Sequence, residues 1–215
     1  NPDFTVAIGL EAYDDEVLRF HVNKGFTTKS WDRAVENLKK FNLRIKTYLM
    51  FKPPFMNEAD ALDHCVKWIA AVAEQSDEIS VNPMTIQRGT VIDRLHRHNE
   101  YRPPWLWSLV DMIRRAHPLI HPEGGINGDD DQVARLIVHP TAGGKIRGSH
   151  NCGQCDAEVV AAIERYAVSG SLLEFDGLSC ACQTVWNAEI TLERQLPVPL
   201  GLSKPRRGSA VHRLR

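Results

Sequence analysis

The sequence predicts an α/β fold with a parallel β-sheet, followed by a small metal-binding extension. Two observations carry this prediction. In residues 5–82, short apolar runs alternate with segments whose apolar residues recur at helical spacing, a pattern typical of strand–helix–strand crossovers in a parallel sheet. Near the C-terminal end, four of the five cysteines fall in two tight pairs, a spacing typical of metal ligands.

The first strand is expected at residues 5–10, a short apolar run that ends in Glu11. Acidic residues at 14–16 favour the first turn of a helix that runs to residue 22, and Asn23-Lys24-Gly25 ends this helix. The next helix has its apolar residues between positions 31 and 41, and Ser30 is its expected N-cap.

The second strand is expected at residues 44–51 and stops at Pro53-Pro54. Asn57 then caps a helix whose apolar face includes Cys65, and the third strand covers residues 78–82 before Pro83. Each strand is followed or closed by a polar residue: Glu11, Lys52 and Asn82. Because the carboxyl ends of parallel strands share one edge, that edge is the expected functional site.

The pattern is less regular after Asn82. Further elements are expected as helices at 105–116, 156–168 and 184–194 and a strand at 134–138, with a polar connection at 117–131. Trp105 and Trp107 lie two positions apart, so only one ring is expected to face inward from a shared helix. We place the domain boundary between residues 117 and 118, which gives a sheet domain at 1–117 and an extension at 118–215.

Charge is balanced over the whole chain but not along it. The 26 Lys and Arg and 27 Asp and Glu give a net charge of −1, which neither favours nor excludes a nucleic-acid partner. Lys145, Arg147 and His150 precede the first cysteine pair, and the tail after Pro197 is basic, so RNA phosphates are expected to bind there. No apolar run approaches twenty residues, so we expect no membrane partner and a cytoplasmic protein.

The cysteine pairs are Cys152 with Cys155 and Cys180 with Cys182. Two closely spaced pairs can complete a tetrahedral shell around one ion, which favours bound Zn²⁺. Iron in place of zinc, a redox or cluster role, and disulfides remain alternatives, although a Cys-x-Cys pair cannot close comfortably on itself.

The opening segment resembles a known enzyme superfamily. VAIGLEAYDDEVLRFHVNKGFTT at 6–28, RIKTYLMFKPPFMNEADALDH at 44–64 and ISVNP at 79–83 are similar to strands and helices of radical S-adenosylmethionine (SAM) enzymes close to the Elongator catalytic subunit and the tRNA methylthiotransferases. NKGFTT, KPPF, YRPPWLWS at 101–108 and HNCGQCD at 150–156 resemble the archaeal radical SAM proteins of archaeosine synthesis. The resemblance covers most of residues 5–190.

The resemblance implies the C-terminal half of a radical SAM partial TIM barrel, with the four-cysteine extension after it. SAM contacts are expected at Glu11, Asn82 and Pro83, although a helix-capping acid and a plain strand end are the simpler readings. Lys52, Asn23, Lys24 and Arg102 are candidate substrate-binding residues, although the first three could serve solubility or turn formation. No Cys-x-x-x-Cys-x-x-Cys loop for a [4Fe-4S] cluster occurs in the sequence, so we expect this loop upstream of Asn1.

The implied function is the final step of archaeosine formation, acting on a lysine-modified 7-deazaguanine in the tRNA D-loop. This makes tRNA and the archaeosine synthase subunit that attaches lysine the expected partners, and the fragment alone is expected to be inactive. Two alternatives remain: another radical SAM tRNA enzyme of the methylthiotransferase or Elongator kind, and a non-enzymatic zinc-dependent RNA-binding module.

Overall fold

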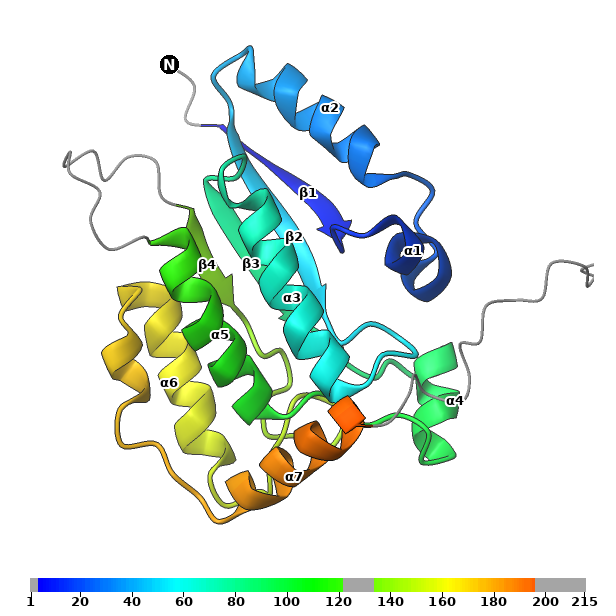
Figure 1. Cartoon of the computed structure of the whole chain (residues 1–215), viewed down its shortest axis with the longest axis vertical. Helices are drawn as coiled ribbons and strands as arrows, with labels where there is room; N and C mark the ends of the chain where they lie inside the picture. Colours follow the sequence, from blue (N-terminus) through cyan, green and yellow to red (C-terminus); the bar gives the residue numbers. More distant parts are fainter. Residues whose placement is uncertain (1–3, 122–133, 196–215) are drawn as a thin grey trace, which may run out of the picture.

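The computed structural model describes residues 4–121 and 134–195 and builds them around a parallel β-sheet (Figure 1). Its strands are β1 (Thr5–Glu11), β2 (Arg44–Phe51), β3 (Glu78–Pro83) and β4 (Arg135–Val138), and they lie side by side in this order. All three strand pairs are parallel. The described part of the chain therefore winds stepwise in one direction, as one side of a barrel does.

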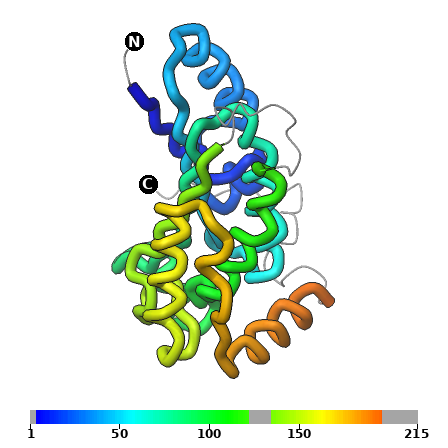
Figure 2. The backbone as a smooth tube through the Cα atoms, turned by 90° about the vertical axis from the view of Figure 1, so that its left-hand side faces the viewer, coloured from blue at the N-terminus to red at the C-terminus, as the bar shows by residue number. Residues whose placement is uncertain are grey.

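The helices connect and cover these strands (Figures 1 and 2). They are α1 (Asp15–Val17), α2 (Thr28–Lys39), α3 (Glu58–Ala73), α4 (Val91–Arg97), α5 (Leu106–Ile120), α6 (Asp156–Ser169) and α7 (Cys182–Gln195). A π-helical turn at Leu18–Val22 extends α1, and a short 3₁₀ helix covers Leu172–Phe175. Strand and helix positions thus confirm the predicted order of elements, while α4 was not predicted.

One face of the sheet is buried and the other is more open. Along β2, alternate residues from Ile45 to Phe51 are buried, whereas Lys46, Tyr48 and Met50 between them are partly exposed. This period-two pattern follows from the pleat of a strand that packs against helices on one side only. α3 and α5 pack against each other and cover this side with a continuous apolar cluster.

Helix caps confirm one prediction and correct another. The Asn57 side chain accepts a hydrogen bond from the backbone N–H of Asp60 and caps α3, as expected. Ser30 does not cap α2, because the helix already begins at Thr28 and the Thr27 hydroxyl accepts the Ser30 backbone N–H at 3.3 Å. Asn23, with φ of 60°, ends the first helical segment, as predicted.

Trp105, which precedes α5, and Trp107, in the first turn of α5, are both buried, which corrects the expectation that only one ring would face inward. Trp105 is 7% exposed and Trp107 is 3% exposed. Trp105 is the N-cap residue and has extended backbone angles, so the helical rule that separates positions two apart does not apply to the pair. Both rings belong to the main apolar cluster of the described residues.

The domain boundary between residues 117 and 118 stays a prediction. β4, which lies in the predicted extension, pairs with β3 of the predicted sheet domain. Most of the polar connection lies outside the described residues, and so does the basic tail with Lys204, Arg206, Arg207, Arg213 and Arg215. Among the helices of residues 4–121 and 134–195, none combines the length and apolar character that a membrane crossing requires.

Candidate functional site

The four paired cysteines converge at one point between the loop before α6 and the start of α7. The Sγ atoms of Cys152, Cys155, Cys180 and Cys182 all lie within 4.8 Å of one another. Three of the separations are 4.0 Å for Cys152 and Cys155, 3.6 Å for Cys152 and Cys180, and 3.7 Å for Cys155 and Cys182. All four thiols are free, so the structure gathers the predicted ligand set without a disulfide.

The first cysteine pair is held in place by a tight loop. Gly153, between the two cysteines, has φ of +89°, a conformation that glycine adopts without strain. The Asp156 carboxylate, at the start of α6, accepts the backbone N–H groups of Asn151 and Gly153. These bonds curl residues 151–156 around the acid, so both thiols point to the same side.

Three of the four sulfur atoms accept hydrogen bonds from other groups of the protein. The Trp107 indole donates to Cys182 Sγ at 3.2 Å, and the Asn151 amide donates to Cys155 Sγ at 3.3 Å. Backbone N–H groups of Gln154 and Cys155 lower the pKa of Cys152, whereas burial raises the pKa of Cys155 and of Cys182. Donors to sulfur stabilise the thiolate form, which is the form that binds a metal.

The spacing fits a single tetrahedral ion. Thiolates bound to one Zn²⁺ at about 2.3 Å would lie about 3.8 Å apart in tetrahedral geometry, close to the three separations given above. In a [4Fe-4S] cluster each cysteine binds a different iron, so those thiolates would lie farther apart. The four-cysteine set therefore forms a metal-binding site whose thiol separations suit one ion.

At the carboxyl edge of the sheet, two predicted site residues lie in contact. The Lys24 ammonium pairs with the Glu11 carboxylate at 3.1 Å, and both side chains remain partly exposed. Glu11 has φ of 72°, a conformation that costs energy in a residue other than glycine. The Asn23 turn places Lys24 here directly after the π-helical segment.

The other predicted edge residues follow in register. Asn82 pairs with Met50 across the sheet and Pro83 pairs with Phe51, so Lys52 lies one residue beyond the paired end of β2. The structure therefore places Glu11, Lys52, Asn82 and Pro83 along one edge, as the strand ends predicted. Their roles toward a cofactor or substrate stay predictions.

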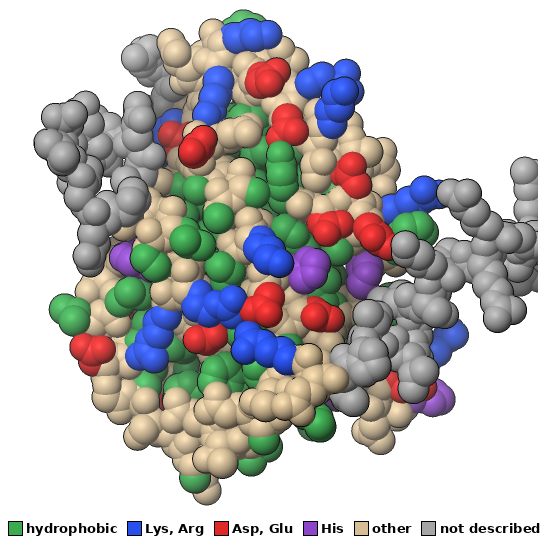
Figure 3. Space-filling model, viewed as in Figure 1, with side chains coloured by type: hydrophobic (Ala, Val, Ile, Leu, Met, Phe, Trp, Pro, Cys, Tyr) green, Lys and Arg blue, Asp and Glu red, His purple; other side chains and the backbone are tan. Residues whose placement is uncertain are grey.

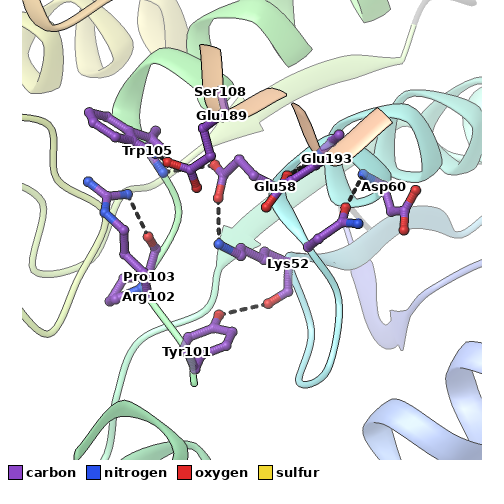
Figure 4. A network of polar contacts seen from close by, with 12 residues as sticks. Lys52, Glu58, Asp60, Tyr101, Arg102, Pro103, Trp105, Ser108, Glu189 and Glu193 are labelled. Carbon is purple, nitrogen blue, oxygen red and sulfur yellow. Dashed lines mark hydrogen bonds and ion pairs between the residues drawn. The ribbon is translucent and has the colours of Figure 1, made fainter. Parts of the chain in front are cut away.

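Lys52 is not a solvated lysine but the centre of a buried network (Figure 4). It is 5% exposed, and its ammonium lies 2.6 Å from the Glu58 carboxylate, which is fully buried. The second Glu58 oxygen accepts the Trp105 backbone N–H at 2.8 Å, and the Tyr101 hydroxyl donates to the Lys52 carbonyl at 2.9 Å. A charge removed from water requires such partners, so the network fixes the end of β2 against α3 and α5.

Two glutamates of α7 join this network from the cysteine side. Glu189 accepts the Trp105 indole N–H at 2.9 Å, and Glu193 accepts the Ala59 backbone N–H at the start of α3 at 2.8 Å (Figure 4). Burial raises the pKa of Glu193. Since α7 begins at Cys182, one helix connects the four-cysteine centre with the carboxyl edge of the sheet.

Arg102 stacks on Trp105, with its guanidinium carbon 3.8 Å from the ring centroid. Its guanidinium donates to the carbonyl oxygens of Pro103 and His150, and burial lowers its pKa. Arg102 forms no direct ion pair within residues 4–121 and 134–195, although the nearby carboxylates of Glu58 and Glu189 act to raise its pKa.

Sequence reasoning missed Glu58, Glu189 and Glu193. Glu58 reads as an ordinary acidic residue in the first turn of a helix, and nothing near it in sequence indicates that it is buried. The two α7 acids lie more than 80 residues from their partners, so no local pattern could reveal these contacts.

The chain is similar to two curated archaeal proteins over most of its length. It is 33% identical to the archaeosine synthase subunit beta of Methanosarcina acetivorans over 193 residues, which cover 90% of this chain and 53% of that protein. It is also 33% identical to the protein of the same name from Thermococcus kodakarensis, over 85% of this chain and 53% of that protein. The chain thus spans about half the length of the curated relatives it matches. No protein-family model matches it.

Among solved structures, Methanocaldococcus infernus Elp3 with an N-terminal deletion resembles the chain with a TM-score of 0.54. The match covers 82% of this chain and 37% of that one, at 15% identity, and therefore concerns the fold alone. It confirms the predicted fold class, a parallel α/β sheet of the Elongator kind that is followed by a four-cysteine cluster. The resemblance predicted from the sequence is confirmed: this chain is similar to archaeosine synthase subunit beta in sequence and to Elp3 in fold.

Proposed function

We propose that this chain is part of a radical SAM enzyme that completes archaeosine in tRNA. The observation that carries the proposal is its similarity to archaeosine synthase subunit beta over nine-tenths of its length. The parallel sheet with Glu11, Lys52 and Asn82 at its carboxyl edge supports it, because this edge is where α/β enzymes bind ligands. The substrate would be a lysine-modified 7-deazaguanine in the D-loop.

The cofactors would be SAM and a [4Fe-4S] cluster. When bound, they would supply the abstraction of a hydrogen atom from the lysine-modified base, which then fragments to leave the formamidine. The sequence holds no cysteine triplet with the radical SAM spacing, and the four clustered cysteines fit one ion. The ligands of the catalytic cluster would therefore come from outside these 215 residues.

The residues of this chain would bind and orient the reactants. Glu11 would accept hydrogen bonds from polar groups of SAM, and the backbone at Asn82 and Pro83 would contact the adenine. Lys24 already pairs with Glu11, so it would stand between cofactor and substrate, next to Asn23. Lys52 would bind a substrate carboxylate only if that carboxylate replaced Glu58, whereas Arg102 forms no direct ion pair that would have to be broken.

For the four-cysteine centre we propose a structural Zn²⁺. Four protein ligands close the coordination shell and leave no position for substrate. The ion would fix the start of α7 and thereby the two glutamates that reach the sheet edge. The expected partners are tRNA and the archaeosine synthase subunit that attaches lysine; the word "subunit" in the names of the relatives supports a second protein.

The test is nucleoside analysis of tRNA after deletion of the gene in its own organism. We expect archaeosine to disappear and its lysine-modified precursor to accumulate, with recovery when a wild-type copy is supplied. A Glu11→Gln copy should fail to restore archaeosine, whereas a Lys40→Ala copy, changed at the exposed C-cap residue of α2, should restore it.

The two alternative functions predict other outcomes. Loss of a methylthio or an Elongator-type uridine modification, with archaeosine intact, would identify another radical SAM tRNA enzyme, an alternative that the Elp3-like fold favours. If the tRNA nucleosides were unchanged, the non-enzymatic zinc-dependent RNA-binding module would be the remaining function.

A further inference from the structure

A basic surface surrounds α4, the helix that the sequence pattern did not reveal. Residues 84–102 and 139–151 together contain six Lys and Arg but two Asp and Glu, in a chain whose total charge is −1. We call Arg88, Arg94, Arg97, Lys145 and Arg147 the α4 surface. Figure 1 shows α4 apart from the helices that cover the sheet, and α4 packs on a small apolar cluster of its own.

One buried acid organises this surface. Asp93 is 2% exposed, and its carboxylate accepts hydrogen bonds from Arg97 and Arg147, both at 2.6 Å, and from the Gly89 backbone. Arg147 also donates to the Ile86 carbonyl and so joins the loop at 143–151 to the segment before α4. A single carboxylate thus holds two guanidiniums side by side, which leaves the pair with a net positive charge.

The remaining cations of the α4 surface face solvent. Arg88, Arg94 and Lys145 are exposed and form no ion pair within the described residues, and the Arg97 side chain stays 66% exposed despite its contact with Asp93. The face over α3, α5 and α7 differs, because its Lys and Arg side chains lie among Asp and Glu side chains (Figure 3). There Arg115 and Arg194 both pair with Asp63.

The α4 surface adjoins the carboxyl edge of the sheet. The Tyr101 hydroxyl bonds to the Lys52 carbonyl at the end of β2, and the Tyr101 carbonyl lies 3.2 Å from the His96 ring on α4. α4 also follows β3 after a short connection. A ligand held by Arg94 and Arg97 would therefore lie beside the edge that carries Lys52 and Asn82.

We infer that the α4 surface binds the phosphate backbone of the tRNA and so holds it next to the carboxyl edge of the sheet. The inference rests on the proposed function and names the part of the chain that would grip the substrate. Four of its five cations are arginines, whose planar guanidiniums bind phosphate oxygens in pairs. Asp93 holds two of them in fixed positions, which reduces the entropy lost on binding.

The test compares tRNA affinity across a salt series for four forms of the 215-residue chain, with an unmodified tRNA transcript as probe. The first is wild type, and the second carries Arg88→Ala, Arg94→Ala and Arg97→Ala. The third replaces the same arginines by lysine. The fourth is a matched control on α2 and its C-cap residue with Lys29→Ala, Arg33→Ala and Lys40→Ala, which removes the same charge from exposed positions.

We expect the alanine triple variant to bind about tenfold more weakly. The slope of log affinity against log salt should flatten by about 2, because fewer phosphate contacts form and fewer counterions are released on binding. The lysine variant should recover most of the affinity, and the α2 control should match wild type. Thermal melting of all four forms would show that the fold is retained.

Equal affinity and slope for wild type and the alanine triple variant would overturn the α4 assignment while leaving tRNA modification intact. An equal loss in the α2 control would also overturn it, since net charge alone would then explain binding. Binding of polyglutamate in preference to tRNA would identify an acidic protein as the partner, and this result would count against the proposed function as well.

Discussion

Helices α3 and α7 lie against each other, yet different forces hold them in place. α3 buries nine of its residues, which include Leu62, Trp68 and Ile69, whereas α7 buries Cys182 and Ile190. Each large apolar side chain that is removed from water stabilises a fold by about 1.5–3 kcal/mol, so packing is enough to fix α3. With two buried residues, α7 needs another source of stability.

Polar contacts supply part of that stability for α7. Trp186 donates to the Ser108 hydroxyl at 2.8 Å, Glu193 accepts the Ala59 N–H, and Arg194 pairs with Asp63. Net hydrogen-bond contributions are about 1 kcal/mol each, and exposed ion pairs contribute less. The four thiols at the start of α7 are the remaining anchor, and a bound ion would make this anchor strong.

Of the single substitutions on the two helices, Glu58→Gln on α3 is expected to lower the free energy of unfolding most. This change leaves the Lys52 ammonium without its carboxylate in a buried site, and the loss of one partner of a buried ion pair costs about 3 kcal/mol. Urea denaturation measures the change in the free energy of unfolding.

Two further variants make this prediction sharper. Addition of Lys52→Met to Glu58→Gln should recover much of the loss, since the unpaired charge is removed. Asp63→Asn, which affects half-exposed ion pairs with Arg115 and Arg194, should cost less than about 1 kcal/mol. An equal loss for Glu58→Gln and Asp63→Asn would show that the Lys52 pair behaves as a surface pair.

A smaller effect is expected on α7, where ionisation of Glu193 should make the free energy of unfolding depend on pH. Burial raises the pKa of this carboxyl above its ordinary value, so the folded state favours the protonated form. The stabilising contribution is present at pH below the ordinary value and is lost as pH rises through the raised pKa. Glu193→Gln cannot ionise and should remove this dependence.

The measurement for Glu193 is the difference in unfolding free energy between wild type and Glu193→Gln from pH 4 to pH 7. We expect the variant to gain on wild type as pH rises, by less than about 1 kcal/mol. A constant difference across this range would mean that Glu193 titrates alike in the folded and unfolded chains.

Sequence patterns predicted the strands and helices of the sheet more completely than they predicted the contacts between them. β2 and α3 followed from periodicity and capping, because these signals lie within each element. α4 was missed, since it is short and packs on Ile86 and Tyr101, which lie outside it. Trp105 was misjudged because a residue at the N-cap does not follow helical geometry.

For the candidate site, the four cysteines were predictable because the two members of each pair are close in sequence. The Lys52–Glu58 pair was not, although the two residues are six positions apart. They meet because the chain reverses between β2 and α3, where Lys52 and Phe55 adopt φ of 56° and 64°. Contacts of this kind depend on the path of the backbone, which residue types alone do not specify.

The most direct test of the contrast between α3 and α7 is amide hydrogen exchange on the chain that contains one zinc, before and after chelation. We expect α7 amides to lose protection when the metal is removed while α3 amides keep theirs, and Cys180→Ser should behave like the chelated wild type. A purified chain without bound metal whose α7 amides are already as protected as those of α3 would contradict the account.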